Sequence, residues 1–210
     1  MPYQSSDKTR QKKDAKRTAM MQAAVQIFAE KGYQAATVRD IVEEAAVSVG
    51  TFYFYFPDKE TLFVHLYEET AEFLIQTLQQ AINSRVSFPQ QVKAVLQSYV
   101  SIAIYEPAVV QLMLVAGVGA VPSLDDKRAA FRESLVGMWD RALHGALDKN
   151  MLAPQNERLT AVALAGAIDA AILNLLARAD RAEEAPAFTR ELNRFVLRAS
   201  AYLGDEGQSG

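Results

Sequence analysis

Residues 48–59 bring together side chains of the kinds that contact nucleic acids. Ser48, Thr51 and Tyr53 supply hydroxyl groups, and Lys59 supplies a cation. Hydroxyl and ammonium groups bind phosphate oxygens, whereas apolar and aromatic groups contact thymine methyl groups in the major groove. Such contacts require a short helix that turns one face toward DNA, so the surrounding elements decide whether this chemistry is available.

Two short helices joined by a tight turn are predicted around this segment. The first covers residues 38–45, and Thr37 caps it in a Thr-x-x-Asp pattern. The second covers residues 48–56. A separation of only two or three residues between short helices is typical of a helix-turn-helix.

The second of these helices has two distinct faces. At about 100° per residue, Val47, Phe52 and Phe56 fall on one side of it. The opposite side carries Val49, Gly50 and Tyr53. A core helix has no use for this second face, whereas a recognition helix in a major groove does.

Residues 17–63 resemble the DNA-binding domain of the TetR family of one-component bacterial regulators. The match holds at many fixed spacings. It comprises Ala23-Ala24, Phe28, Gly32-Tyr33, Thr37-Val38-Arg39-Asp40-Ile41, Val47-Ser48, Gly50-Thr51, Phe52-Tyr53, Tyr55-Phe56 and Lys59-Glu60.

The resemblance implies that nine residues between 37 and 59 bind operator DNA. Thr37 and Lys59 would hold phosphates, and Arg39 would contact a base. Ser48 would cap the recognition helix. That helix would contribute Val49, Gly50, Thr51, Tyr53 and Tyr55.

Two features of this segment leave alternatives open. Arg39 is also spaced to pair with Glu43 at i+4, which would hold its helix without touching a base. Ala46 stands where the family usually has glycine, and a positive φ there would cost alanine about 1 kcal/mol. The turn either bears that cost or avoids the left-handed conformation.

Helical periodicity continues from residue 17 to the end of the chain. It predicts an all-α fold of about nine helices, three short ones followed by six longer ones. The predicted spans are 17–31, 38–45, 48–56, 58–84, 87–105, 107–117, 122–150, 154–180 and 185–203.

Composition separates four parts of the chain. Residues 1–17 hold six Lys and Arg against two Asp, although the whole chain has a net charge of −3. A basic arm of this kind is compatible with phosphate contact and equally with a solvated, disordered segment. We expect a basic disordered arm (1–16), a helix-turn-helix DNA-binding domain (17–57), a ligand-binding and dimerisation domain (58–203) and a disordered tail (204–210).

Several other classes of site are disfavoured. The chain has no cysteine, which excludes disulfides and thiolate zinc sites, and we expect neither a metal nor a cofactor. The longest apolar stretch, residues 107–122, is short of the ~20 residues that cross a bilayer. We therefore expect a cytoplasmic protein with no membrane segment.

Residues 161–177 are apolar on every side of a helix and must be covered on both faces. In the family, the last two helices pair with their two-fold mates in a four-helix bundle, and residues 161–177 and 185–203 suit that role. Small residues here let a partner backbone come close, while a central helix of a monomeric core is the alternative. The predicted dimer residues are Ala163, Gly166, Ala167, Ala170 and Ala171.

Polar or adaptable side chains within the apolar helices are candidates for lining an effector cavity among the fifth to eighth helices. For each of them, hydrogen bonding within the core or on a solvated helix face is the alternative. They are Tyr99, Tyr105, Gln111, Met113, Trp139, His144, Asp169 and Asn174.

Together these patterns predict a homodimeric, ligand-responsive transcription regulator. It would be a repressor that a small hydrophobic or amphipathic effector releases from operator DNA. A helical ligand-binding or scaffold protein without operator binding is the alternative. An all-α enzyme is disfavoured because the two histidines stand 79 residues apart, and the chain contains no HExxH, GxxxxGK[ST] or GxGxxG motif.

Overall fold

A computed structural model describes the backbone of residues 7–204 and the side chains of residues 15–204. The predicted basic arm lies partly outside these residues, and the predicted tail lies outside them except for Gly204. The first helix begins at Asp7, ten residues before the start expected from the sequence.

The described residues form nine α-helices, with one π-helical and one 3-10 turn between them. They have no β-strand, only an isolated bridge between Leu152 and Tyr202. The predicted all-α class is therefore confirmed. In chain order the elements are α1 (Asp7–Ala35), α2 (Val38–Glu44), α3 (Val49–Tyr55), α4 (Lys59–Asn83), α5 (Phe88–Tyr105), α6 (Pro107–Gln111), η1 (Leu112–Ala116), η2 (Pro122–Leu124), α7 (Asp125–Leu147), α8 (Glu157–Leu176) and α9 (Arg181–Ala199).

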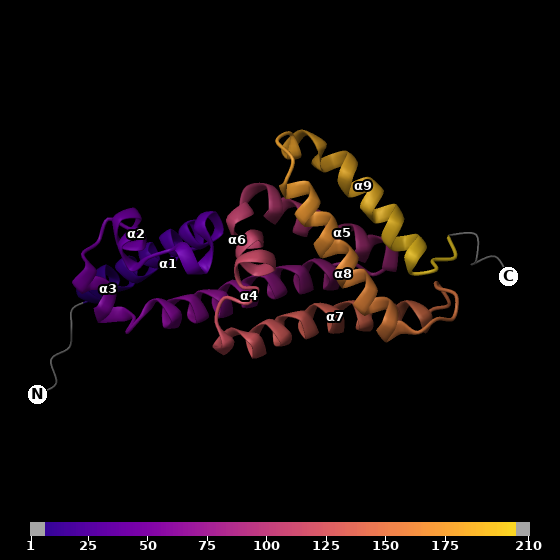
Figure 1. The fold of residues 1–210 in the computed structure, drawn as a ribbon. Coiled ribbons are helices and arrows are strands. Elements are labelled where there is room, and N and C mark those ends of the chain that lie inside the picture. The colour runs from indigo at the N-terminus through magenta and orange to yellow at the C-terminus, as the bar shows by residue number, and fades with distance from the viewer. Residues whose placement is uncertain (1–6, 205–210) are drawn as a thin grey trace, which may run out of the picture.

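The helices α1–α3 gather at one end of the molecule, and α4 runs from them along the rest (Figure 1). We call residues 17–57 the head and residues 58–203 the body. Within the body, α4 packs against α5 and α7, α7 packs against α8, and α9 packs against both α5 and α8. The segment α6–η1 lies against α1, so head and body touch at a second place besides α4.

Side-chain caps fix the starts of the short helices. Thr37 and Asp40 form the predicted capping box at α2. Ser48 before α3 and Asp58 before α4 each accept a hydrogen bond from the amide three residues on, at 3.1 and 2.7 Å. These bonds satisfy amides that a helix leaves unpaired at its N-terminus, which is why such short helices are well defined.

The turn between α2 and α3 adopts the left-handed conformation at Ala46, where φ is 51°. The Ala46 amide donates to the Glu43 carbonyl at 3.2 Å, and the Val47 amide donates to the Val42 carbonyl at 3.0 Å. This pair of bonds is a Schellman motif, normally closed by glycine. The alternative that the turn avoids a positive φ was therefore wrong.

The predicted helix over residues 107–117 is split. It starts as α6 and widens into the π-turn η1 before Gly117. A Cβ atom at Gly117 would lie 2.9 Å from Cε2 of Tyr67, so only glycine lets this turn approach α4. π-turns within helices are frequent at functional sites.

The helix predicted from residue 154 begins instead at Glu157. Asn156 accepts a hydrogen bond from the Leu159 amide at 2.9 Å and acts as the N-cap. Pro154 lies outside the helix in the segment that bridges to Tyr202. The proline suggested a start, but the asparagine side chain supplies the actual one.

Helix α8 is long and apolar enough to span a bilayer, with a mean hydropathy of 1.9, and 33% of that stretch is buried in the protein. The bent pair of α5 with α6–η1 passes the same test. Core helices of soluble proteins have this composition too. Unlike a typical core helix, α8 has an apolar surface that its own chain leaves largely uncovered.

Replacing Ala46 by glycine should stabilise the protein by about 0.5–1 kcal/mol. The gain comes from removing left-handed strain of about 1–2 kcal/mol, less the larger entropy of an unfolded glycine. Urea unfolding measures the difference. The matched control is Ala45→Gly, which should destabilise because φ at Ala45 is −76°. A loss of stability in Ala46→Gly would contradict the strain assigned to this turn.

Candidate nucleic-acid interface and effector cavity

Helix α3 presents the two faces predicted from the sequence. Phe52 and Phe56 are buried in the core of the head. On the opposite side, Tyr53 is 55% exposed, and Gly50 beside it is exposed as well. Val49 and Phe54 are also exposed, and Tyr55 is half-buried. A seven-residue helix thus projects aromatic and small side chains into solvent while its other side anchors it.

Hydroxyl groups at the start of α3 are already linked to one another. The side-chain oxygens of Ser48 and Thr51 lie 2.9 Å apart, and Ser48 also caps the helix. The pair forms a small polar edge beside Gly50, which has no side chain to block an approaching backbone.

The start of α2 forms a second polar edge. Thr37 Oγ1 donates to Asp40 Oδ2 at 2.8 Å, and Lys31 Nζ donates to Asp40 Oδ1 at 2.8 Å. The bonds from Lys31 and Thr37 lower the pKa of the Asp40 carboxyl to about 2. Thr37 is exposed, so its hydroxyl proton can turn from Asp40 to another acceptor.

Arg39 forms the ion pair with Glu43 that the sequence offered as the alternative to a base contact. Its Nε donates to Glu43 Oε1 at 2.8 Å, and its side chain is 84% exposed. The two terminal nitrogens of the guanidinium are left for other acceptors. Helix support and base contact are therefore compatible in this geometry.

Lys59 is held more closely than the sequence suggested. Its ammonium donates to the carbonyls of Tyr33 and Ala36, each at 2.7 Å, and lies 4.2 Å from the centre of the Tyr33 ring. Burial lowers the pKa of this ammonium. Lys59 thus ties the start of α4 to the end of α1, and one of its three protons remains for a phosphate.

Three of the eight candidate ligand residues meet in the centre of the body. Tyr99 on α5 donates its hydroxyl to Asp169 Oδ1 at 3.0 Å, and Trp139 lines the same small cavity. That cavity, between α4, α5, α7 and α8, measures only about 10 Å³. A cavity of this size holds at most one water molecule.

The other five candidates do not join this cavity. Met113 is buried within η1 and Gln111 is half-buried at its start. Tyr105 is 80% exposed at the end of α5. His144 pairs on the surface with Glu157 and Asp148, and the exposed Asn174 accepts a bond from Arg178 at 3.1 Å.

Arg132, which the sequence did not single out, binds Asp169 as well. Its Nη1 donates to Asp169 Oδ2 at 3.2 Å from α7. Burial raises the pKa of Asp169 to about 6, although the Tyr99 hydrogen bond and the Arg132 charge act in the opposite direction. Arginines are common on helix surfaces, so no local pattern marks this one.

A larger hollow lies between α4 and α7. It has a volume of about 320 Å³ and is lined mainly by apolar groups, among them Tyr67, Ile75 and Phe131. Tyr67 and Phe131 make an edge-on contact with ring centres 6.4 Å apart. Tyr67 also packs against Gly117, so this hollow borders the π-turn that touches the head.

The predicted dimer residues lie along the uncovered part of α8, with one difference. Ala163 and Ala170 are exposed, and Ala167 and Ala171 are half-exposed. Gly166 lies toward α7 instead, because a Cβ atom there would be 3.2 Å from Arg132 Nη2. Its small size makes room for the arginine that binds Asp169.

Stability should report the ionisation of Asp169. In an unfolded chain this carboxyl loses its proton near pH 3.9, but in the folded protein its pKa is about 6. Between these values the folded state binds more protons, so this residue's contribution to stability falls as pH rises from 4 to 6. Asp169→Asn should remove that fall.

Urea unfolding of wild type and Asp169→Asn between pH 4 and 7 makes the comparison, with the exposed Asp126→Asn as control. The variant should gain stability relative to wild type as pH rises through this window, whereas the control should not. A wild-type-to-variant difference that stays constant from pH 4 to 7 would show that Asp169 ionises as an exposed aspartate does.

The head matches a known sequence family. Residues 20–66 match the model described as bacterial regulatory proteins, tetR family. Over 83 residues the chain is 29% identical to the fatty acid metabolism regulator protein of Bacillus subtilis, covering 40% of this chain and 43% of that protein. Over 73 residues it is 30% identical to the transcriptional repressor KstR2 of Mycolicibacterium smegmatis, and this match covers 35% of this chain and 36% of that protein. The chain thus spans less than half the length of these curated relatives.

Solved structures share the fold over most of the chain. FadR from Bacillus subtilis, in complex with stearoyl-CoA, superposes with a TM-score of 0.72 at 20% identity, covering 83% of this chain and 96% of that one. The MbdR regulator from Azoarcus sp. CIB superposes with a TM-score of 0.76 at 16% identity, covering 88% and 98%. Residues 20–66 therefore belong to the tetR family of bacterial regulatory proteins, and the chain as a whole shares the fold of solved regulators of that family.

Proposed function

We propose that this protein is a homodimeric, cytoplasmic transcription repressor that a small effector releases from operator DNA. The observation that carries the proposal is the exposed face of α3, held outward by buried Phe52 and Phe56. The division into a DNA-binding head (17–57) and a ligand-binding and dimerisation body (58–203) is part of the same proposal. Its relatives are transcriptional regulators, which argues against an enzyme.

The proposed DNA contacts use the residues identified from the sequence. Val49, Gly50, Thr51, Tyr53 and Tyr55 would enter the major groove with α3, and Ser48 would hold its start. Thr37 and the remaining proton of Lys59 would reach phosphates on either side. Few of these groups can form hydrogen bonds to bases, so methyl contacts, Arg39 and DNA shape would determine the sequence preference.

Two heads are needed for useful affinity, since one short helix reads few base pairs. The uncovered apolar surface of α8 supports a two-fold dimer through α8 and α9. Burying this surface between copies would also explain why so apolar a helix is compatible with a soluble protein. The two copies of α3 would then face successive major grooves about 34–36 Å apart.

The effector would act through the elements that join body and head. Gln34 Nε2 in the head donates to the Ala120 carbonyl at 3.1 Å, just beyond η1. Ser123 Oγ donates to Glu60 Oε1 at 2.6 Å on the first turn of α4. A ligand that parts α4 from α7 would shift both connections and the spacing of the heads.

An amphipathic effector fits the body better than a fully polar one. The hollow between α4 and α7 is mostly apolar. A polar group lies nearby between α5, α7 and α8, where the buried Tyr99 and the half-exposed Arg132 both bind Asp169. The similarity to a fatty acid metabolism regulator and to a stearoyl-CoA-bound FadR supports an acyl compound. To release the DNA, the effector must bind more tightly to the conformation whose head spacing does not fit the operator than to the one that does.

Selection from a random DNA library should enrich a two-fold symmetric operator. On this operator Arg39→Ala should cost about 1–3 kcal/mol per half-site and relax one base position, because a base contact is lost. Tyr53→Phe should weaken binding less and equally for all sequences, since only a phosphate bond is lost. Arg141→Ala, on an exposed part of α7, serves as the control.

Identical preferred sequences for wild type and Arg39→Ala would assign Arg39 to helix support through Glu43. Failure of the wild type to enrich any sequence, at salt low enough for electrostatic binding, would favour the alternative of a ligand-binding protein without an operator.

Ala163→Arg should give monomers that no longer bind operator DNA. The side chain is exposed, so arginine leaves the core intact but adds bulk and charge to the proposed interface. Ala129→Arg, at an exposed position on α7, is the matched control. Sedimentation measures the assembly, and circular dichroism checks the fold. A wild-type protein that sediments as a monomer at micromolar concentration would contradict the dimer.

A further inference from the structure

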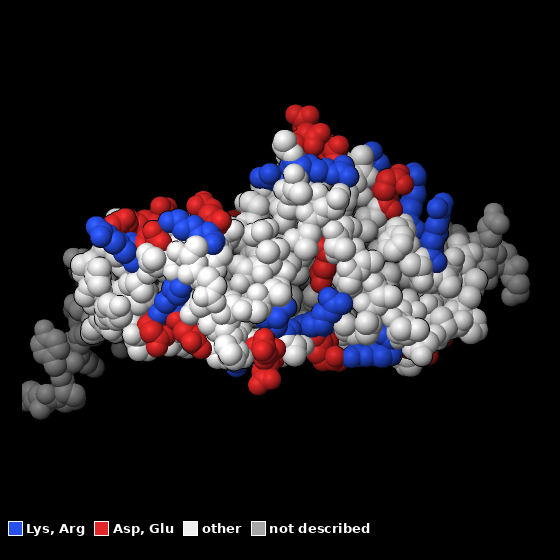
Figure 2. Space-filling model, in the orientation of Figure 1, with Lys and Arg blue, Asp and Glu red and all other residues white. Residues whose placement is uncertain are grey.

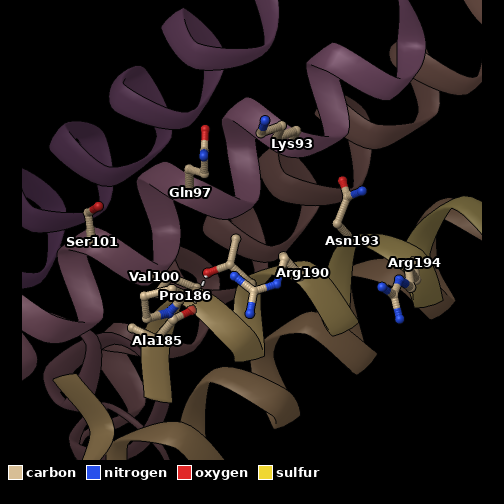
Figure 3. A pocket seen from close by; sticks show the side chains of 10 residues that line it. Lys93, Gln97, Val100, Ser101, Ala185, Pro186, Arg190, Asn193 and Arg194 are labelled. Carbon is tan, nitrogen blue, oxygen red and sulfur yellow. Dashed lines mark hydrogen bonds between the residues drawn. The ribbon is translucent and has the colours of Figure 1, made fainter. Parts of the chain in front are cut away.

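A groove of about 700 Å³ runs along the contact between α5 and α9 (Figure 3). It shares no lining residue with the hollow proposed for the effector. Side chains from the two helices face it from opposite sides. Lys93, Gln97 and Ser101 come from α5, and Arg190, Asn193 and Arg194 come from α9. This volume is within the range of small-molecule sites.

The lining of this groove is strongly positive. It includes three cations and no carboxylate. Arg194 Nη1 donates to Glu191 at 2.9 Å, but Lys93 and Arg190 form no ion pair with any residue that the structure describes. Figure 2 shows Lys and Arg side chains along α9 beyond its acidic start. Two uncompensated cations facing one hollow favour a doubly charged anion.

Asn193 gives a second, independent indication. Its Oδ1 is buried and accepts no hydrogen bond, which holds for no other buried side-chain oxygen or nitrogen among the described residues. Buried polar atoms are normally paired, so an unpaired one in a native protein calls for a partner. The missing group is a donor, an N–H or an O–H. Because the oxygen is shielded from solvent while Asn193 lines the groove, a donor in the groove reaches it once this side chain turns outward.

The groove is separate from the other proposed surfaces. It lies in the body, at a distance from α3, so its cations cannot reach the same DNA as the head (Figure 1). On α9, residues 186, 190 and 193 face α5, whereas Phe188 and Phe195 share a different edge of the helix. A dimer through α8 and the Phe195 edge would leave the groove open.

We propose that this groove binds an organic phosphate whose phosphate is held by Lys93 and Arg190. An N–H or O–H group of the same ligand donates to Asn193 Oδ1. A dianionic phosphate balances the two unpaired cations, and guanidinium and ammonium groups are the usual partners of phosphate oxygens. The rest of the ligand lies against Val100 and Pro186, because the groove is larger than a lone ion.

Inorganic phosphate, sulfate and glycerol 3-phosphate at pH 7 and constant ionic strength are the probes. Amide chemical shifts of the full-length protein report binding at α5 and α9. Phosphate, which carries an O–H, should bind at least tenfold more tightly than sulfate, which has none. Glycerol 3-phosphate should bind at least fivefold more tightly than phosphate because it adds hydroxyl donors and fills more of the groove.

Variants separate the two parts of the site. Lys93→Gln with Arg190→Gln should weaken phosphate binding at least tenfold, whereas the control pair Arg141→Gln with Lys149→Gln, on exposed cations elsewhere, should not. Asn193→Leu should remove the preference for phosphate over sulfate without lowering the unfolding temperature, since the replaced amide oxygen is unpaired. A merely structural asparagine would instead lower that temperature and leave the preference unchanged.

Three results would overturn the proposal. Equal affinities for phosphate and sulfate would mean a nonspecific cationic surface. Equal affinities for phosphate and glycerol 3-phosphate would mean that the groove takes an ion alone. Absence of phosphate binding, together with a changed sedimentation coefficient in the Lys93→Gln and Arg190→Gln double variant, would make this groove a contact between copies of the chain.

Discussion

The contact of α1 with the first turns of α4 determines how the head sits on the body. The Phe63 ring lies 4.6 Å from Phe28 and 4.8 Å from Tyr33, measured between ring centres. One turn earlier, Lys59 closes the same contact from above the Tyr33 ring. Because Phe28 and Phe63 are fully buried, α4 cannot tilt at its start without opening the core of the head. A tilt of α4 at its start would therefore move the head with it.

The features that the sequence predicts correctly are those that neighbouring residues determine. The caps at Thr37 and Ser48 act within three residues, so the starts of α2 and α3 follow from local chemistry. The two faces of α3 follow from helix geometry and from the contrast between Phe52 and Gly50. The conformation at Ala46 was left open, because a left-handed alanine is decided by the packing on both sides of the turn and not by its own preference.

The parts that could not be predicted depend on contacts between distant residues. Asp169 meets Tyr99 from 70 positions away and Arg132 from 37, so no spacing rule connects them. The two carbonyls bound by Lys59 belong to the last turn of α1 and to Ala36 just after it, whereas the sequence suggested only a phosphate partner for this residue. Tyr105 and His144 resembled pocket residues because of their apolar neighbours along the chain, but the structure turns both toward solvent.

Helix α8 connects the proposed effector site with the proposed dimer interface. Asp169 points from it toward the centre, while Ala163 and Ala170 lie on its uncovered side. Gly166 lies between these two sides and lets Arg132 reach Asp169. A ligand that displaces the bond between Arg132 and Asp169 would therefore act at the contact between α7 and the helix that carries the proposed interface. Since α7 also packs against α4, separation of α7 and α8 would change the distance between the heads through α4 and the dimer contact together.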